Sequence, residues 1–181
     1  MEVLKIIEKY YEKQSEAYSL LVKHSRSVAD KALAIATVHP EMKLDLPFID
    51  EAAMLHDIGM LYCDAPEIFC YGSYDYVCHG IVGAEMLRKE GFPRHALVCE
   101  RHTGTGITLD MIVNKTLPLP HQDFLPVSLE EQLICFSDKF FSKSKPDKEK
   151  SIVKIEKSLQ KHGEEAVLRF INWCKLFLLH K

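Results

Sequence analysis

Residues 53–59 read Ala-Met-Leu-His-Asp-Ile-Gly, and they place His56 and Asp57 in the most apolar stretch of the chain. The predicted helix that contains this pair begins after Pro47 and is apolar on nearly every face, which is typical of a buried helix. Gly59 is expected to end it. Because a buried charge is costly unless it is paired or bound to a metal ion, Asp57 requires a partner inside the protein.

Four other polar side chains occupy positions where core residues are expected: His24, His79, His102 and Asp138. The first two lie on the apolar stripes of the predicted helices 19–38 and 75–90, where apolar residues recur every three or four positions. The third ends a short predicted helix, 94–102, directly before a glycine-containing turn. The fourth shares a helix face with Ile134 and Phe141.

Two explanations of this pattern remain open. A lone buried histidine is more often a core residue bonded to the backbone than a metal ligand, and a lone helix aspartate is usually solvated or a cap. Such a separate structural role would have to be found for each of the six side chains, whereas one shared metal centre explains all six. Nearby cationic side chains are too few to take the place of a metal ion, since neither Lys31 nor Lys139 is positioned to pair with both Asp57 and Asp138. Histidine and carboxylate ligands together favour a transition metal.

The same residues resemble the signature of the HD superfamily of metal-dependent phosphohydrolases. The series His24, His56-Asp57 and Asp138 is similar to its defining motif, and residues 53–59 are similar to the HDIG form of that motif. His79 and His102 resemble the two additional histidines of members with a two-metal site. The resemblance spans about residues 24–141 and implies an all-α fold, an HD-domain helical bundle with the metal site at its centre.

The resemblance also implies how the ligands divide. The first ion would be held by His24, His56, Asp57 and Asp138, and the second by His79 and His102 with Asp57 bridging. The implied cofactor is a pair of divalent transition-metal ions, iron or manganese in the first place, with nickel, cobalt, zinc and magnesium also compatible.

The implied function is hydrolysis of a small phosphate ester or nucleotide by a metal-activated water, with Asp57 as a catalytic residue. Lys139 is the second catalytic candidate, and it either meets a substrate phosphate or is a solvated lysine. Two alternatives stay open: a di-iron oxygenase built on the HD fold, and a non-catalytic nucleotide-binding HD module.

The substrate and the residues that bind it are not determined by these motifs. Residues 103–106 read Thr-Gly-Thr-Gly, and Met60 follows Gly59, which departs from the cyclic-di-GMP phosphodiesterase branch in both places. Residues 103–106 look more like the small standalone HD hydrolases, including the dinucleoside tetraphosphatase type. An insertion at about residues 115–128 departs from that group as well.

Composition limits the classes further. The 181 residues, 47% of them hydrophobic, fit a single HD domain over 1–181, with a metal-site core at about 20–142 and C-terminal helices at about 149–179. A formal charge of −3 gives no basic excess for duplex nucleic acid. A small phosphorylated molecule or nucleotide is the expected partner, and the oligomeric state is unknown. No membrane segment is expected, and six cysteines without a C-x-x-C pair predict reduced thiols in a cytoplasmic protein.

Several local features complete the prediction. A helix is expected over 2–17, no strand is expected, and 142–150 reads as a polar linker. Thr108 is expected to cap a short helix, and Ser128 with Glu131 fits a capping box. The aromatic residues of the loop that follows Gly59 either wall the site or cover the helices. Surface positions are expected for His39, His95, His121, His162 and His180.

Overall fold

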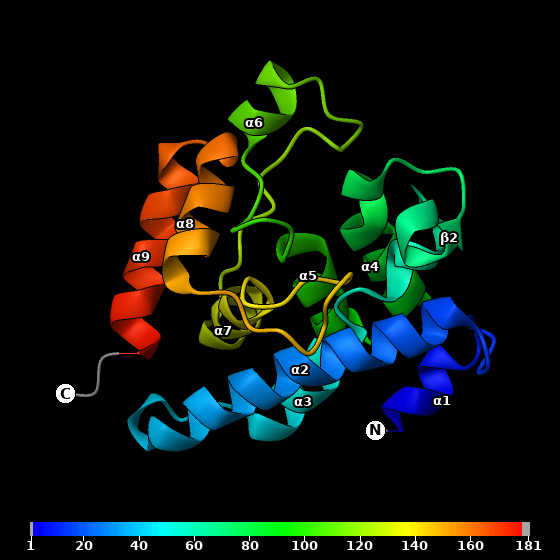
Figure 1. The fold of residues 1–181 in the computed structure, drawn as a ribbon, viewed down its shortest axis with the longest axis horizontal. Coiled ribbons are helices and arrows are strands. Elements are labelled where there is room, and N and C mark those ends of the chain that lie inside the picture. The colour runs from blue at the N-terminus through cyan, green and yellow to red at the C-terminus, as the bar shows by residue number, and fades with distance from the viewer. Residues whose placement is uncertain (1, 179–181) are drawn as a thin grey trace.

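The structure, a computed structural model, describes residues 2–178 and is built almost entirely of helices (Figure 1). The expected all-α fold class is confirmed. Its α-helices are α1 (Val3–Ile7), α2 (Glu16–Val38), α3 (Leu46–Leu55), α4 (His79–Lys89), α5 (Pro93–Arg101), α6 (Leu109–Asn114), α7 (Leu129–Asp138), α8 (Ile152–Leu159) and α9 (Glu164–Phe177). Short 3₁₀ helices are η1 (Pro40–Met42), η2 (Ile58–Tyr62), η3 (Pro66–Ile68), η4 (Tyr76–Cys78) and η5 (Gln160–His162).

Two short strands were not predicted. β1 (Asp64–Ala65) and β2 (Cys70–Tyr71) form an antiparallel hairpin in the loop that follows η2. Each strand is two residues long, which is too short to show a two-residue alternation in the sequence.

The prediction of one helix over 2–17 was wrong. α1 ends at Ile7, and Ser15 caps the start of α2 because its hydroxyl accepts a hydrogen bond from the Tyr18 amide. Between the two helices, the buried Tyr11 hydroxyl donates to the Ile58 carbonyl at 2.9 Å and accepts from the Leu61 amide at 3.1 Å. The N-terminal segment therefore turns inward and anchors η2.

His56 and Asp57 lie at the end of a helix, not inside one. α3 ends at Leu55, His56 is its C-terminal cap, and Asp57 precedes η2. Gly59 does not end a helix as predicted, because it lies within η2 against α4. A Cβ atom at this position would lie 2.2 Å from the His79 carbonyl oxygen. The glycine is therefore required for close packing of η2 on α4.

The expected caps of the later helices are confirmed. Thr108 accepts from the Met111 amide at the start of α6. Ser128 and Glu131 form the predicted capping box at the start of α7. The C-terminal helices begin and end close to the expected bounds, and residue 179, the predicted end of the last one, lies outside the described residues.

Two hydrophobic cores meet along α2. The larger core joins α2, α3 and α7 to the C-terminal helices α8 and α9, with Val28, Phe136, Phe170, Trp173 and Phe177 among its members. The second core packs beneath η2, α4 and α5, with Ile7, Leu21, Leu55, Met60 and Leu87 among its members. His24 lies on α2 between Leu21 of the second core and Val28 of the larger one.

The cysteines are reduced as predicted, whereas one of the histidines expected at the surface is buried. All six cysteines are free, and only Cys174 among them is not buried. His39 is buried rather than exposed, and its Nε2 donates to the Phe177 carbonyl oxygen at 3.1 Å. His95 and His162 are half-buried, His121 is exposed, and His180 lies outside the described residues. Within residues 2–178, no helix combines the length and the apolar composition that a membrane span needs.

We expect Gly59→Ala to lower the free energy of unfolding by about 1–3 kcal/mol, because the added methyl group overlaps backbone atoms of α4. Urea denaturation measures this change. The control is Glu85→Ala on the exposed side of α4, which should stay within about 0.5 kcal/mol of the wild type. Equal stability of the two variants would contradict the close approach described here.

Candidate metal centre

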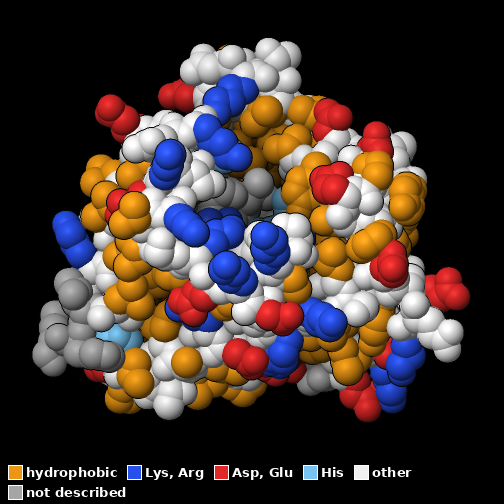
Figure 2. All heavy atoms as spheres, viewed as in Figure 1, with side chains coloured by type: hydrophobic (Ala, Val, Ile, Leu, Met, Phe, Trp, Pro, Cys, Tyr) orange, Lys and Arg blue, Asp and Glu red, His pale blue; other side chains and the backbone are white. Residues whose placement is uncertain are grey.

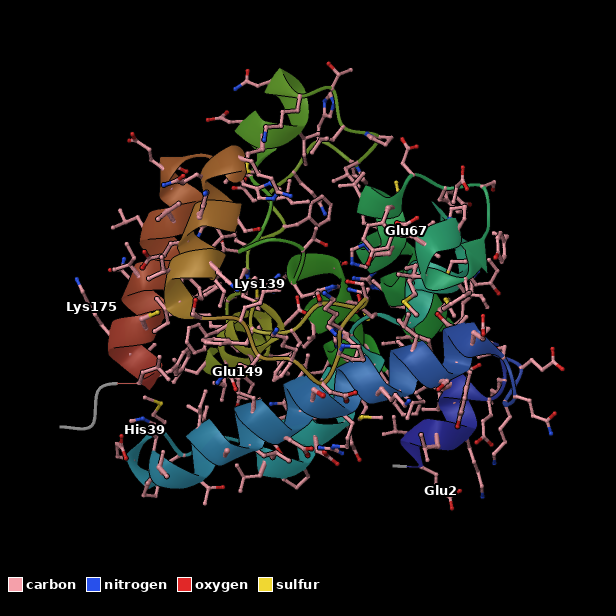
Figure 3. The ribbon with its side chains drawn as sticks, in the orientation of Figure 1. Glu2, His39, Glu67, Lys139, Glu149 and Lys175 are labelled. Carbon is pink, nitrogen blue, oxygen red and sulfur yellow. The ribbon has the colours of Figure 1, made fainter. Side chains whose placement is uncertain are left out.

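The six predicted side chains converge on one point between the two cores. His24 comes from the middle of α2, His79 is the first residue of α4, and Asp138 is the last residue of α7. His102 caps the end of α5, and His56 and Asp57 follow α3. None of the six is more than 8% exposed. Figure 3 labels Lys139, the residue after Asp138, near the middle of the bundle.

One group of ligand atoms surrounds one oxygen of Asp57. Asp57 Oδ2 lies 3.2 Å from His24 Nε2 and 3.0 Å from His56 Nε2. Asp138 Oδ1 lies 3.0 Å from the same nitrogen of His24. Each of these four residues offers an atom within 4.8 Å of the others, a spacing that could hold one metal ion.

A second group surrounds the other oxygen of Asp57. Asp57 Oδ1 lies 3.3 Å from His79 Nε2 and 3.2 Å from His102 Nε2, and these two nitrogens are 3.0 Å apart. This trio could also hold an ion. Asp57 therefore presents one oxygen to each group, as a bridging carboxylate would.

The backbone fixes three of the imidazole rings in one tautomer. The Nδ1 atoms of His56, His79 and His102 lie 2.6–2.7 Å from the carbonyl oxygen three residues earlier in each case. Because a carbonyl oxygen only accepts, each Nδ1 carries a proton, and in the neutral ring it is Nε2 that has the lone pair. Metal-binding histidines are commonly oriented by this kind of bond.

Lone pairs consequently face lone pairs across the centre. His24 Nε2, His56 Nε2 and Asp57 Oδ1 are buried and have no hydrogen-bond partner within the described residues, and Asp57 Oδ2 is paired with the Lys143 ammonium group. Neutral imidazole nitrogens and carboxylate oxygens attract one another only through a shared proton or cation. The donor set is therefore matched to divalent ions with affinity for nitrogen and oxygen ligands.

The prediction that neither Lys31 nor Lys139 satisfies both aspartates is confirmed, but the prediction that nearby cations are too few was wrong because it overlooked Lys143. Lys139 Nζ lies 2.8 Å from Asp138 Oδ2, and Lys143 Nζ lies 2.7 Å from Asp57 Oδ2. Lys31 pairs instead with Glu149. Lys143 lies in the segment expected to be a polar linker, and the chain is no longer helical there, so helical periodicity gave no signal for its position.

Lys139 was expected either to meet a substrate phosphate or to be a solvated lysine, and the structure shows that it is not solvated. Its side chain is 12% exposed, and its ammonium group also donates to the His102 carbonyl at 3.3 Å.

Tyr76 is a further part of the centre. Its ring stacks on the His79 imidazole, with centroids 4.6 Å apart and planes 17° from parallel. Its carbonyl oxygen holds His79 Nδ1, and burial raises the pKa of its phenol. Of the loop aromatics, Tyr76 walls the site, whereas Tyr71 and Tyr74 are exposed.

Burial and the neighbouring carboxylates shift the pKa values of His56 and His102 in opposite directions. Burial lowers the pKa of His56, but the adjacent Asp57 and Asp138 carboxylates outweigh burial and raise this pKa to about 9. Burial lowers the pKa of His102 to about 4, although Asp57 opposes that shift. Burial also raises the pKa of Asp57, but His56 and Lys143 hold it well below its ordinary range. The aspartates therefore stay ionised and draw positive charge to the centre.

Comparison with known families identifies the part of the chain that carries this centre. The family model described as "HD domain" matches residues 21–143, a range that contains all six side chains. The uncharacterized protein MJ0778 of Methanocaldococcus jannaschii is 34% identical over 146 residues, which are 78% of this chain and 79% of that protein.

Two further relatives are tRNA (cytidine(56)-2'-O)-methyltransferases. The one from Thermoplasma volcanium is 30% identical over 90% of this chain and 43% of its own length. The one from Picrophilus torridus is 29% identical over 87% of this chain and 41% of its own length. The chain thus spans less than half of either methyltransferase.

A solved structure shares the fold. The crystal structure of the HD domain of the phosphodiesterase PgpH from L. monocytogenes aligns with a TM-score of 0.53 and 18% identity. The alignment covers 92% of this chain and 85% of that one. At this level of identity the likeness establishes the helical bundle alone.

Adding Mn²⁺ to the metal-free protein should raise its melting temperature, because a cation relieves the contacts between lone pairs. At a concentration one hundred times the Kd, one site stabilises by about 2.7 kcal/mol, or roughly 5–10 °C for a chain of this size. Differential scanning calorimetry measures the shift.

Asp57→Asn should abolish most of this rise, since it removes the charge shared by both groups. The matched control is Asp110→Asn, which makes the same change at an exposed position and should keep the full rise. A full rise in the Asp57 variant would show that the ion binds elsewhere.

Proposed function

The chain belongs to the HD domain family, and on that premise we propose that it is a metal-dependent phosphohydrolase acting on a small phosphate ester or nucleotide. The observation that carries the proposal is the position of Asp57. Its two carboxylate oxygens face two separate groups of imidazole nitrogens, all of them buried. Two ions bound at one bridging carboxylate are a recurring arrangement in hydrolytic enzymes.

In this proposal the ligands divide as the geometry groups them. The first ion is held by His24, His56, Asp57 and Asp138, and the second by Asp57, His79 and His102. Iron and manganese suit this mixture of nitrogen and oxygen donors, and hard calcium or magnesium sites are richer in oxygen. When bound, such ions supply Lewis acidity, which lowers the pKa of water and draws electron density from a phosphoryl group.

The protein's own residues prepare this chemistry. The carbonyl bonds to Nδ1 fix three imidazoles in direction, with Nε2 turned toward the centre. Asp57 is proposed as the catalytic carboxylate that both groups share. Lys139 is proposed to donate a hydrogen bond to a phosphoryl oxygen of the substrate, because its ammonium group lies beside Asp138 at the edge of the centre. Burial of the centre keeps competing water away from these charges.

We further propose that residues 1–181 act as a single HD domain, with a metal-site core at about 20–142 and C-terminal helices at about 149–179. Support comes from the larger core, in which Phe170 and Phe177 of α9 pack on Phe136 of α7. The methyltransferases contain more than twice the length that this chain covers, so methyl transfer is not part of the proposal.

The test measures metal content and hydrolysis together. Protein reconstituted with Mn²⁺ or Fe²⁺ should contain two ions per chain and cleave members of a panel of nucleotides and phosphodiesters. His102→Ala should keep one ion, because the group around His24 stays intact. Asp57→Asn should lose activity by on the order of 100-fold or more, whereas Asp110→Asn should keep it.

Anaerobic assays separate the alternatives. A hydrolase cleaves its substrate without oxygen, whereas a di-iron oxygenase of this fold requires oxygen and consumes it. Tight nucleotide binding with no turnover in the metal-loaded protein would favour the non-catalytic module. A preparation that binds no metal would contradict the whole proposal.

A further inference from the structure

We propose that a lysine-lined cavity beside the metal centre binds the additional phosphates of a substrate that carries two or more linked phosphates. This inference rests on the proposed function, since the reacting phosphate is placed at the metal centre. The cavity has a volume of about 320 Å³. Its lining includes the charged or histidine side chains Asp138, Lys139, Lys143, Lys150, Lys161 and His162.

The charge of this cavity is opposite to that of the whole chain. The sequence has 26 acidic and 23 basic residues, yet four lysines and one aspartate line the cavity. Figure 2 shows blue Lys and Arg side chains to the left of and below a central hollow, with a pale blue histidine visible at the right edge of the hollow. A cleft lined by one sign of charge concentrates ligands of the other sign, so the cavity favours anions.

Two of these lysines have no acidic partner of their own. Within residues 2–178, no carboxylate lies within ion-pair distance of Lys150 or Lys161. Lys150 Nζ donates only to backbone carbonyls, those of Phe141 at 2.9 Å and Lys139 at 3.4 Å. Its pKa is lowered by burial and also by neighbouring lysines, although Asp138 opposes this. An anion in the cavity would relieve that repulsion.

The cavity adjoins the proposed reaction site. Asp138, a proposed metal ligand, and Lys139 line it directly, and Lys143 joins it to Asp57 through the ion pair at 2.7 Å. Lys150, which precedes α8, and Lys161, which lies within η5, complete the lysine lining. A phosphate held at the metal centre would therefore have its linked neighbours among Lys143, Lys150 and Lys161.

A second cavity indicates that the substrate also has an apolar part. This cavity, of about 150 Å³, shares Gly104 and His162 with the first. Half of its remaining lining consists of apolar side chains, those of Val77, Ile107, Met111 and Leu117, and Lys115 also lines it. The two cavities together fit an organic polyphosphate, such as a nucleoside triphosphate, better than a simple phosphate monoester.

Calorimetric titration of the metal-free protein tests the lysine subsite. The probes are inorganic triphosphate and orthophosphate at physiological ionic strength, after the chelator used to remove metal has been dialysed away. Triphosphate should bind more tightly than orthophosphate. Lys161→Met should weaken triphosphate binding roughly tenfold, the effect of losing one charged hydrogen bond.

The matched control is Lys157→Met, which makes the same change on α8 at an exposed residue outside the cavity lining. Lys161 makes no side-chain bond to the described residues, so its loss should leave the fold intact. Equal weakening in the two variants would overturn the subsite, as would equal affinity of the wild type for both anions.

The role of the apolar cavity is tested by comparing the binding of adenosine triphosphate and inorganic triphosphate. Adenosine triphosphate should bind more tightly than inorganic triphosphate, and Leu117→Asn, which adds no charge, should remove this difference while inorganic triphosphate binding stays unchanged. Equal binding of the two triphosphates by the wild-type protein would overturn the organic part of the proposal.

Activity measurements distinguish this inference from the proposed function. If triphosphate binding depends on Lys161 but the metal-loaded protein cleaves no phosphate compound, the anion subsite holds and the hydrolase proposal fails. If the protein cleaves polyphosphorylated substrates with a KM that Lys161→Met leaves unchanged, the hydrolase proposal holds and the subsite is overturned.

Discussion

The burial of the Asp57 carboxylate is the constraint on which the arrangement of the metal centre depends. This carboxylate is fully buried, it faces four imidazole nitrogens, and only Lys143 forms an ion pair with it through an ammonium group in the described part of the chain. A carboxylate in such a place is costly unless positive charge surrounds it. The bundle brings that charge as one lysine and a set of nitrogen donors that could hold metal ions.

The fold fixes this carboxylate through contacts that lie outside the centre. The Tyr11 hydroxyl bonds the backbone of η2 at two points, and Gly59 allows η2 to touch α4 without an intervening side chain. Backbone carbonyls then orient the rings of His56, His79 and His102. The Tyr11 hydrogen bonds, the close contact at Gly59 and the carbonyl bonds to the rings therefore fix the positions of the ligand side chains. A site arranged in this way by the fold limits the free-energy cost of binding an ion.

The sequence predicted the members of the centre because polar residues at apolar helix positions stand out against a regular pattern. Asp138 and His24 were recognisable for that reason. Lys143 was not, since it follows the end of α7 on an irregular segment that has no helical periodicity. The end of α1 was missed because the inward turn of the chain at Tyr11 depends on hydrogen bonds to Ile58 and Leu61, residues far away in the sequence.

The central claim is that one buried aspartate is shared by two metal ions. Anomalous diffraction from crystals grown with Mn²⁺ tests it most directly, because the signal locates each ion without assuming its ligands. We expect two peaks, one among His24, His56, Asp57 and Asp138, and one among Asp57, His79 and His102. Crystals in which Mn²⁺ gives no peak beside Asp57 would contradict the account.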